Sequence, residues 1–204
     1  PGREQNIAFH ACKCGFARLK RHRAKVLDRR HAPHSAAAGV DAGGGAARII
    51  RLCASRIQPC RGCGFCLENS GECVLAPDDA DALFAAMRTA PAALFASPVY
   101  FYALPGQFKL FIDRSQKFWH CQKGESSGLR PAAVIMAAAR KRGEKLFAGS
   151  LLTLKWFLKP FGLEIGRPLL LTGLETLPDV GQEELDAAHA AGFGLARMAT
   201  AANR

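Results

Sequence analysis

The stretch that decides the fold is Ala92-Ala-Leu-Phe-Ala96, followed by Ser97-Pro-Val-Tyr-Phe101. Its first five residues are all apolar, and Pro91 separates them from the preceding segment. An apolar run of this length next to a helix breaker is typical of a central strand covered on both faces of a sheet. We therefore predict that residues 92–96 form such a strand and that residues 97–105 form the loop after it.

Strand-like and helix-like segments alternate on both sides of this strand. Asp78 to Arg88 has acidic residues first and an apolar face, which is typical of an amphipathic helix with negative charge at its amino end. Alternation of this kind favours an α/β fold with a doubly wound, parallel, five-stranded sheet. The predicted strands are 6–9, 47–52, 92–96, 131–139 and 163–172 (interrupted by Gly166 and Pro168), and the predicted helices are 78–88, 106–118, 144–160 and 182–201.

The composition is that of an ordinary globular protein of 204 residues, with 49% hydrophobic and 22% charged residues. No apolar run reaches the roughly 18–20 residues of a membrane-spanning helix, and no apolar stretch of signal-peptide type is seen. We therefore expect a cytoplasmic protein with no membrane interaction.

The net charge of +11 is concentrated near the amino end, where eight Lys and Arg residues between Lys13 and Arg30 face one acid, Asp28. Such a run is more often a solvated face than a nucleic-acid contact, and it lacks the regular aromatic residues of a single-strand binding groove. We expect residues 1–45 to be an atypical basic segment with a first strand, and residues 46–204 to be the main part of a single domain.

Four of the eight cysteines lie within fourteen residues, in a loop predicted for residues 53–77. Their spacing is C-x2-C-x2-C-x6-C, and Gly62 and Gly64 let the backbone turn the sulfurs toward one centre. Four thiolates satisfy a [4Fe-4S] cube, whereas a structural zinc site usually has two pairs separated by a longer loop. We favour the cluster over zinc or a bare thiol group, with the ligands Cys60, Cys63, Cys66 and Cys73.

Two segments, taken together and in this order, resemble the iron–sulfur flavoproteins, within the NAD(P)H-dependent FMN reductase or flavodoxin-like group. The first is Arg56-Ile-Gln-Pro-Cys-Arg-Gly-Cys-Gly-Phe-Cys66 with Gly71-Glu-Cys-Val74 and Asp78-Asp79, and the second is Ser97 to Phe101 with Gly106 to Arg114. The likeness covers roughly residues 46–200. It implies a flavodoxin-like fold, bound FMN, a nearby [4Fe-4S] cluster in a cysteine-rich loop after the second strand, and a homo-oligomer, either a dimer or a tetramer.

The resemblance also implies where FMN would bind. Ligands of open α/β sheets lie beyond the carboxyl ends of the strands, where the strand order reverses. The loop after the central strand would contact the isoalloxazine, and the loop after the next strand would bring cations to the same crevice. The flavin contacts expected on this basis are Arg18, Ser97, Pro98, Val99, Tyr100, Phe101, Gly106, Ala139 and Arg140.

The segment that would hold the FMN phosphate departs from the family pattern. Only Gly15 and Arg18 match, and bulky Phe16 and His22 stand among residues where family members have small or hydroxyl-bearing ones. Either the segment is garbled, or its arginines bind phosphate in place of hydroxyl groups. In the first case this chain binds FMN poorly.

The function predicted from these features is that of an FMN and [4Fe-4S] oxidoreductase or electron-transfer protein, with NAD(P)H or a ferredoxin as electron donor. No catalytic acid or nucleophile is predicted. Two alternatives stay open: a basic nucleic-acid-binding protein with a structural zinc site, and a cofactor-poor member of the same family.

Overall fold

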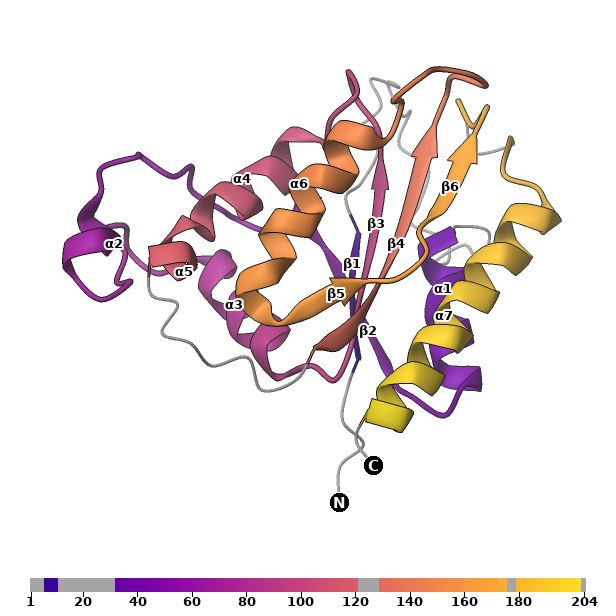
Figure 1. The fold of residues 1–204 in the computed structure, drawn as a ribbon, viewed down its shortest axis with the longest axis horizontal. Helices are drawn as coiled ribbons and strands as arrows, with labels where there is room; N and C mark the ends of the chain where they lie inside the picture. Colours follow the sequence, from indigo (N-terminus) through magenta and orange to yellow (C-terminus); the bar gives the residue numbers. More distant parts are fainter. Residues whose placement is uncertain (1–5, 11–31, 121–128, 176–178, 203–204) are drawn as a thin grey trace, which may run out of the picture.

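The computed structural model describes residues 6–10, 32–120, 129–175 and 179–202. A central sheet lies between two layers of helices (Figure 1). Helices α3 to α6 cover one face, while α1 and α7 cover the other. The carboxyl ends of β3, β4 and β6 point to the same edge of the sheet, at the top of Figure 1.

All strand pairs in the sheet are parallel, and the order is β2-β1-β3-β4-β5, with β6 also pairing with β4. The outermost position is shared by β5 and β6, which pair with successive parts of β4 around the predicted interruption. The strands are β1 (Asn6–His10), β2 (Ala47–Arg51), β3 (Ala93–Pro98), β4 (Arg130–Ala138), β5 (Leu163–Ile165) and β6 (Leu169–Thr172). This confirms the α/β parallel fold, whose strand order reverses between β1 and β3.

The helices follow the predicted alternation. Acidic residues begin α3, where the Asp78 side chain accepts a hydrogen bond from the amide of Ala80 (2.9 Å) and forms a capping box with Asp81. The helices are α1 (Ala32–Ala42), α2 (Phe65–Glu68), α3 (Asp79–Thr89), α4 (Gly106–Arg114), α5 (Gln116–His120), α6 (Ala148–Leu158) and α7 (Gln182–Ala202), with 3-10 turns η1 (Leu52–Ala54) and η2 (Lys159–Phe161). None of the described helices is long and apolar enough to cross a bilayer.

The two faces of the sheet have different cores. The side of α3 to α6 is aromatic, with Phe84 stacked on Phe111 (ring centroids 4.5 Å apart) and Phe157 packed against three further rings. The side of α1 and α7 is built mainly from small residues. There a Cβ added to Gly192 would lie 1.9 Å from the carbonyl oxygen of Ala36, so the two helix backbones are nearly in contact.

The structure corrects the predicted limits of two helices. The helix predicted for 106–118 breaks at Ser115, whose hydroxyl donates to the carbonyl of Ile112 (2.6 Å) and competes with the helical ladder. The helix predicted for 144–160 begins only at Ala148, because Lys145 has a left-handed backbone (φ 61°) that ends any helix through it.

Helix α1 was not predicted from the sequence. Alanine-rich composition and Pro33 in its first turn favour a helix, and Gly44 with φ 88° ends it. The preceding basic run has no clear period and hides this start. Because β1 lies between β2 and β3, the described parts of residues 1–45 belong to the same sheet and helix layers as the rest.

Candidate functional site

The carboxyl edge of the sheet brings together the loops after β3 and β4, beside the point between β1 and β3 at which the strand order reverses. Both strands end there in register, with Ser97 paired to Met136 and Pro98 paired to Ala137. This is where ligands of open α/β sheets bind. The expected phosphate contact Arg18 lies outside the described residues.

The loop after β3 leaves the sheet as an ordered extension of the strand. The amide of Val99 donates to the carbonyl of Ala137 (2.8 Å), which extends the pairing with β4 beyond Pro98. Ser97 is buried, and its hydroxyl donates to the carbonyl of Pro98 (2.9 Å). The predicted flavin contacts Ser97 to Tyr100 thus lie at the edge, but the Ser97 hydroxyl is engaged within its own loop.

A tight turn ends this loop. Tyr100 and Ala103 exchange two backbone hydrogen bonds of 2.9 Å each, so Phe101 and Tyr102 form the tip. Both tip residues have positive φ, 50° and 62°, and the Phe101 side chain is fully exposed. Left-handed backbone in bulky residues is strained and is concentrated at functional sites.

Tyr102 connects the two loops of the edge. Its ring lies under the guanidinium of Arg140 (5.9 Å to the ring centroid), and its hydroxyl is 3.5 Å from Nη1 of the same arginine. A Cβ added to Gly149, at the start of α6, would lie 3.1 Å from the Tyr102 carbonyl. Tyr102 was not among the predicted contacts, and its sequence position gave no sign of this packing.

The loop after β4 carries four exposed cations, Arg140, Lys141, Arg142 and Lys145, with one acid, Glu144. The backbone carbonyl of Arg140 accepts a hydrogen bond from the amide of Gly173 (3.2 Å), and the aliphatic part of the Lys141 side chain packs on the same glycine. Arg140 therefore contacts Tyr102 on one side and Gly173 on the other, and it forms a positive rim with the neighbouring cations; Ala139 precedes it in the same loop.

Gly106 begins α4 after the turn, and a Cβ added to it would meet no atom within 4 Å. Open space at this helix start leaves room for a ligand. The described part of the edge therefore has features that suit FMN: an aromatic tip, an open helix start and a cationic rim.

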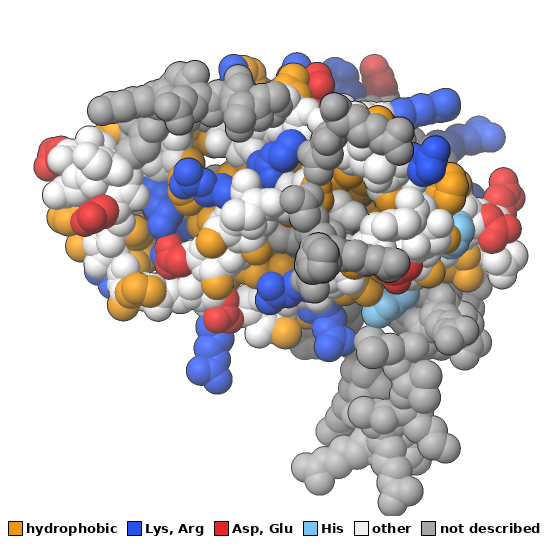
Figure 2. All heavy atoms as spheres, turned by 90° about the horizontal axis from the view of Figure 1, so that it is seen from below, with side chains coloured by type: hydrophobic (Ala, Val, Ile, Leu, Met, Phe, Trp, Pro, Cys, Tyr) orange, Lys and Arg blue, Asp and Glu red, His pale blue; other side chains and the backbone are white. Residues whose placement is uncertain are grey.

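The four predicted ligand cysteines lie between η1 and α3, in residues 55–78, which we call the cysteine loop. The loop projects from the side of the molecule and contains α2 (Figure 1). Gly62 (φ 63°), Gly64 (φ 74°), Ser70 (φ 50°) and Gly71 (φ 85°) give it tight left-handed bends between the cysteines. At the left of Figure 2, hydrophobic and acidic side chains share this end of the surface.

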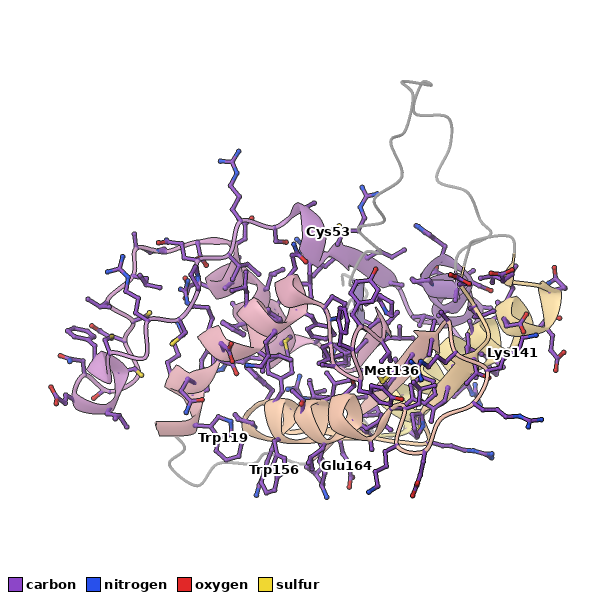
Figure 3. All side chains as sticks on the ribbon, turned by 90° about the horizontal axis from the view of Figure 1, so that it is seen from above. Cys53, Trp119, Met136, Lys141, Trp156 and Glu164 are labelled. Carbon is purple, nitrogen blue, oxygen red and sulfur yellow. The ribbon has the colours of Figure 1, made fainter. Side chains whose placement is uncertain are left out.

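The four cysteines of the loop are free thiols, with Cys60 and Cys63 exposed and Cys66 and Cys73 partly buried. Burial raises the pKa of the Cys66 thiol, a backbone hydrogen bond partly opposes this rise, and the charges of the other three cysteines raise the pKa further. Cys53, in contrast, is disulfide-bonded and lies on η1, just before the loop begins (Figure 3).

The kind and number of sulfur atoms in the loop fit an iron–sulfur cluster, but the positions of these sulfur atoms do not yet form a metal site. Four free thiols with flexible bends between them are the ligands that such a cluster needs. However, within the described residues no group of three or more Cys, His, Asp or Glu side chains is arranged to hold a metal ion. Binding of a cluster would therefore require the four sulfur atoms to move closer together.

The family model described as "NADPH-dependent FMN reductase" matches residues 15–158. The chain belongs to this family. The match includes both loops of the sheet edge and the whole cysteine loop.

Curated members of the group show more specific similarity. This chain is 31% identical over 150 residues to an iron–sulfur flavoprotein of Archaeoglobus fulgidus, and the alignment covers 72% of this chain and 63% of that protein. An iron–sulfur flavoprotein of Methanocaldococcus jannaschii is 37% identical over 68 residues, which are 33% of this chain and 34% of that protein. The chain thus spans less than two thirds of the length of these relatives.

Solved structures of this family's wider fold class superpose on almost the whole chain. An NAD(P)H:quinone oxidoreductase from Methanothermobacter marburgensis has a TM-score of 0.67 at 16% identity, covering 95% of this chain and 96% of that one. A flavodoxin from the domain Archaea has a TM-score of 0.55 at 10% identity, covering 96% and 99%. These likenesses confirm the flavodoxin-like fold.

Proposed function

We propose that this chain is an FMN-dependent oxidoreductase that also carries a [4Fe-4S] cluster on the cysteine loop. The observation that carries the proposal is the combination of four free thiols in one loop with the aromatic and cationic sheet edge of a family described as FMN reductases. The names of the two curated relatives support the cluster.

The flavin end of the proposal rests on the turn after β3. Within the described part of the chain, the amides of Phe101 and Tyr102 donate to no protein acceptor, because the turn uses only those of Tyr100 and Ala103. These two N–H groups are available to the polar edge of an isoalloxazine. Phe101 would cover one ring face, while Tyr102 holds Arg140 at the rim. Bound FMN would supply the chemistry of exchanging electrons in pairs or singly.

The cationic rim gives the proposed electron donor a charge-matched approach. Arg140, Lys141, Arg142 and Lys145 form no ion pair within the described residues, so their charges are not neutralised by the protein. They would attract the phosphates of NAD(P)H or the acidic surface of a ferredoxin. The same charges would stabilise an anionic, reduced flavin.

The cluster end rests on Cys60, Cys63, Cys66 and Cys73 as ligands. Metal sites of this kind are rarely preformed in the absence of the metal, because the thiols must lose protons and converge on binding. The left-handed bends at Gly62 and Gly64 lie between the first three ligands and would allow this convergence.

Reconstitution tests the cluster. Protein incubated anaerobically with iron and sulfide should retain about four irons per chain, as a four-cysteine cube requires. Cys63→Ala should lose this iron, whereas Cys53→Ala, which opens a disulfide outside the loop, should retain it. Stoichiometric zinc in the purified protein with no uptake of iron would reject the cluster and favour a structural zinc site.

A homo-oligomer, either a dimer or a tetramer, remains part of the proposal. The outer face of α6 supports it, because two large apolar side chains four residues apart, Leu152 and Trp156, are 58% and 48% exposed on this one helix. Sedimentation equilibrium would decide: a single species at the monomer mass of 21.9 kDa over the working concentration range would reject it.

A further inference from the structure

The two ends of the cysteine loop are bound to each other by hydrogen bonds, two of which end on aspartate carboxylates. At one end, the amide of Arg56 donates to Asp79 (2.7 Å), and the amide of Asp79 donates back to the carbonyl of Arg56 (3.2 Å). Two residues on, the amide of Gln58 donates to the Asp78 carboxylate (2.8 Å). The loop therefore closes just before Cys60, at the start of α3.

Arg114, the last residue of α4, lies under this closure. Its side chain is 1% exposed, and its Nη1 is 2.5 Å from the Asp78 carboxylate and 3.3 Å from the carbonyl of Gln58. Its Nη2 is 3.5 Å from Asp81, whose other oxygen accepts from Lys117 (2.6 Å). One guanidinium thus contacts both Gln58, two residues before Cys60, and Asp78, the residue that ends the loop.

The shape of arginine suits this position. A planar guanidinium can donate to a carboxylate and a carbonyl in different directions, whereas the ammonium of lysine is a compact point charge. A buried ion pair adds little net stability compared with an apolar pair, but removing one partner leaves the other charged and buried. The pair is thus better suited to fixing one arrangement than to raising overall stability.

We propose that Arg114 is the positioning residue of the cysteine loop: its ion pair with Asp78 holds both ends of the loop in the register that lets the four thiols gather around a cluster. This inference rests on the proposed function, since the cluster is part of it. It goes further in connecting the two ends of the site, because α4 begins after the flavin turn at Gly106 and ends at Arg114. Helix α4 then fixes the cysteine loop relative to the sheet edge.

Amide hydrogen exchange on the metal-free protein tests the closure directly. Loss of the guanidinium in Arg114→Met should raise the exchange rates of the Arg56 and Gln58 amides about tenfold or more, the effect of losing one charge-assisted hydrogen bond. Arg114→Lys keeps the charge and should give an intermediate rate. Amides of β3 and β4 should change much less.

Arg130→Met is the matched control. Arg130 is a half-buried arginine that donates to backbone carbonyls, those of Met87 (3.1 Å), Ala90 and Phe161 (2.5 Å), and no hydrogen bond joins it to the described cysteine loop. Its loss should loosen η2 and the carboxyl end of α3, and it should leave the Arg56 and Gln58 amides, which are bonded at the opposite end of α3, unchanged. Equal exchange of these two amides in Arg114→Met and Arg130→Met would overturn the proposal.

A second readout follows the cluster itself. In reconstituted protein, Arg114→Met should release iron to a chelator severalfold faster than Arg130→Met, with Arg114→Lys in between. Equal release rates in Arg114→Met and Arg130→Met would also overturn the positioning role. Failure of the unchanged protein to take up iron would reject the proposed cluster and, with it, this role, even if the exchange data support the closure at Arg114.

Discussion

At the level of single residues, the backbone strain at the sheet edge calls for a physical explanation. Phe101 and Tyr102 are consecutive bulky residues with left-handed backbone, each at a cost of about 1–2 kcal/mol. Tyr102 is held by Arg140, but Phe101 is fully exposed and gains no packing in return. An exposed aromatic ring on a strained turn is consistent with a ligand contact, and it gives the first prediction.

Phe101→Gly should stabilise the protein and weaken FMN binding. Glycine relieves the left-handed strain, and after its larger unfolded-state entropy is subtracted the gain should be at most about 1 kcal/mol. Thermal unfolding and FMN titration by flavin fluorescence would measure the two effects. Phe193→Ala, which changes an exposed aromatic residue on α7, should leave the FMN affinity unaltered. A destabilised Phe101→Gly variant with unchanged FMN affinity would contradict this role.

Asp81 gives a prediction about pH. Burial raises the pKa of its carboxyl, but the hydrogen bond and charge of Lys117, the Asp78 amide and the charge of Arg114 outweigh burial and leave this pKa below its ordinary value. A lowered pKa in the folded state adds stability that is present above the unfolded pKa of about 3.9 and is lost as the pH falls through the folded pKa.

Asp81→Asn should therefore lower the free energy of unfolding at pH 7, and the difference from the unchanged protein should shrink as the pH falls below about 4. Urea unfolding at several pH values would measure it. A difference that is constant from pH 7 to pH 3, or that grows on acidification, would mean that the Asp81 carboxylate has no favourable partner in the folded state.

At the scale of elements, α1 and α7 are packed through glycines. A Cβ on Gly192 would meet the backbone of α1, whereas a Cβ on Gly194 would meet no atom within 4 Å. Gly192→Ala should destabilise the protein by about 1–3 kcal/mol through overpacking. Gly194→Ala, two residues further along the same helix, should stabilise it by about 0.5–1 kcal/mol.

Chemical unfolding of both variants measures this difference in stability. Both changes gain the same helix propensity, and only the first places a Cβ against the backbone of α1. Similar stabilisation by the two changes would show that α1 does not pack closely on α7.

Most elements could be predicted from local patterns, and the exceptions have physical reasons. The apolar run of β3 and the acidic start of α3 are signals carried within a few residues, and both were confirmed. The break at Ser115 and the late start of α6 depend on a side-chain hydrogen bond and on one left-handed residue, which the apolar pattern does not encode. The start of α1 was hidden by the basic run before it.

At the scale of the whole molecule, the candidate site has a part that sequence spacing reveals and a part that only the fold brings together. The four cysteines are close in sequence, so their spacing alone predicted a centre there. The closure at Arg114 joins residues from three separate segments, and Tyr102 meets Arg140 across two loops, so neither contact has a local sequence signal. Predictions for residues 11–31, including the phosphate contact Arg18, lie outside the described residues and stay predictions.

The position of the cysteine loop predicts that the protein can lose the cluster without losing its fold. Most of the loop projects from the side of the molecule (Figure 1), and none of its four cysteines belongs to either core, although Ile57 packs against the aromatic one. Cys63→Ala should therefore lose the cluster while its far-ultraviolet circular dichroism and thermal midpoint in the metal-free state match those of the unchanged protein. A large drop in the midpoint of this metal-free variant would mean that the loop is part of the folding core.

The central claim is that this chain combines FMN with a four-iron cluster, and the most direct test is to measure both cofactors together. Anaerobic protein, reconstituted with iron and sulfide and then equilibrated with FMN, would be assayed for iron, sulfide, flavin and zinc and examined by visible spectroscopy. We predict about four irons and four sulfides per chain, with FMN bound at the same time and bleached on reduction. Protein that takes up zinc but neither iron nor FMN would contradict the account.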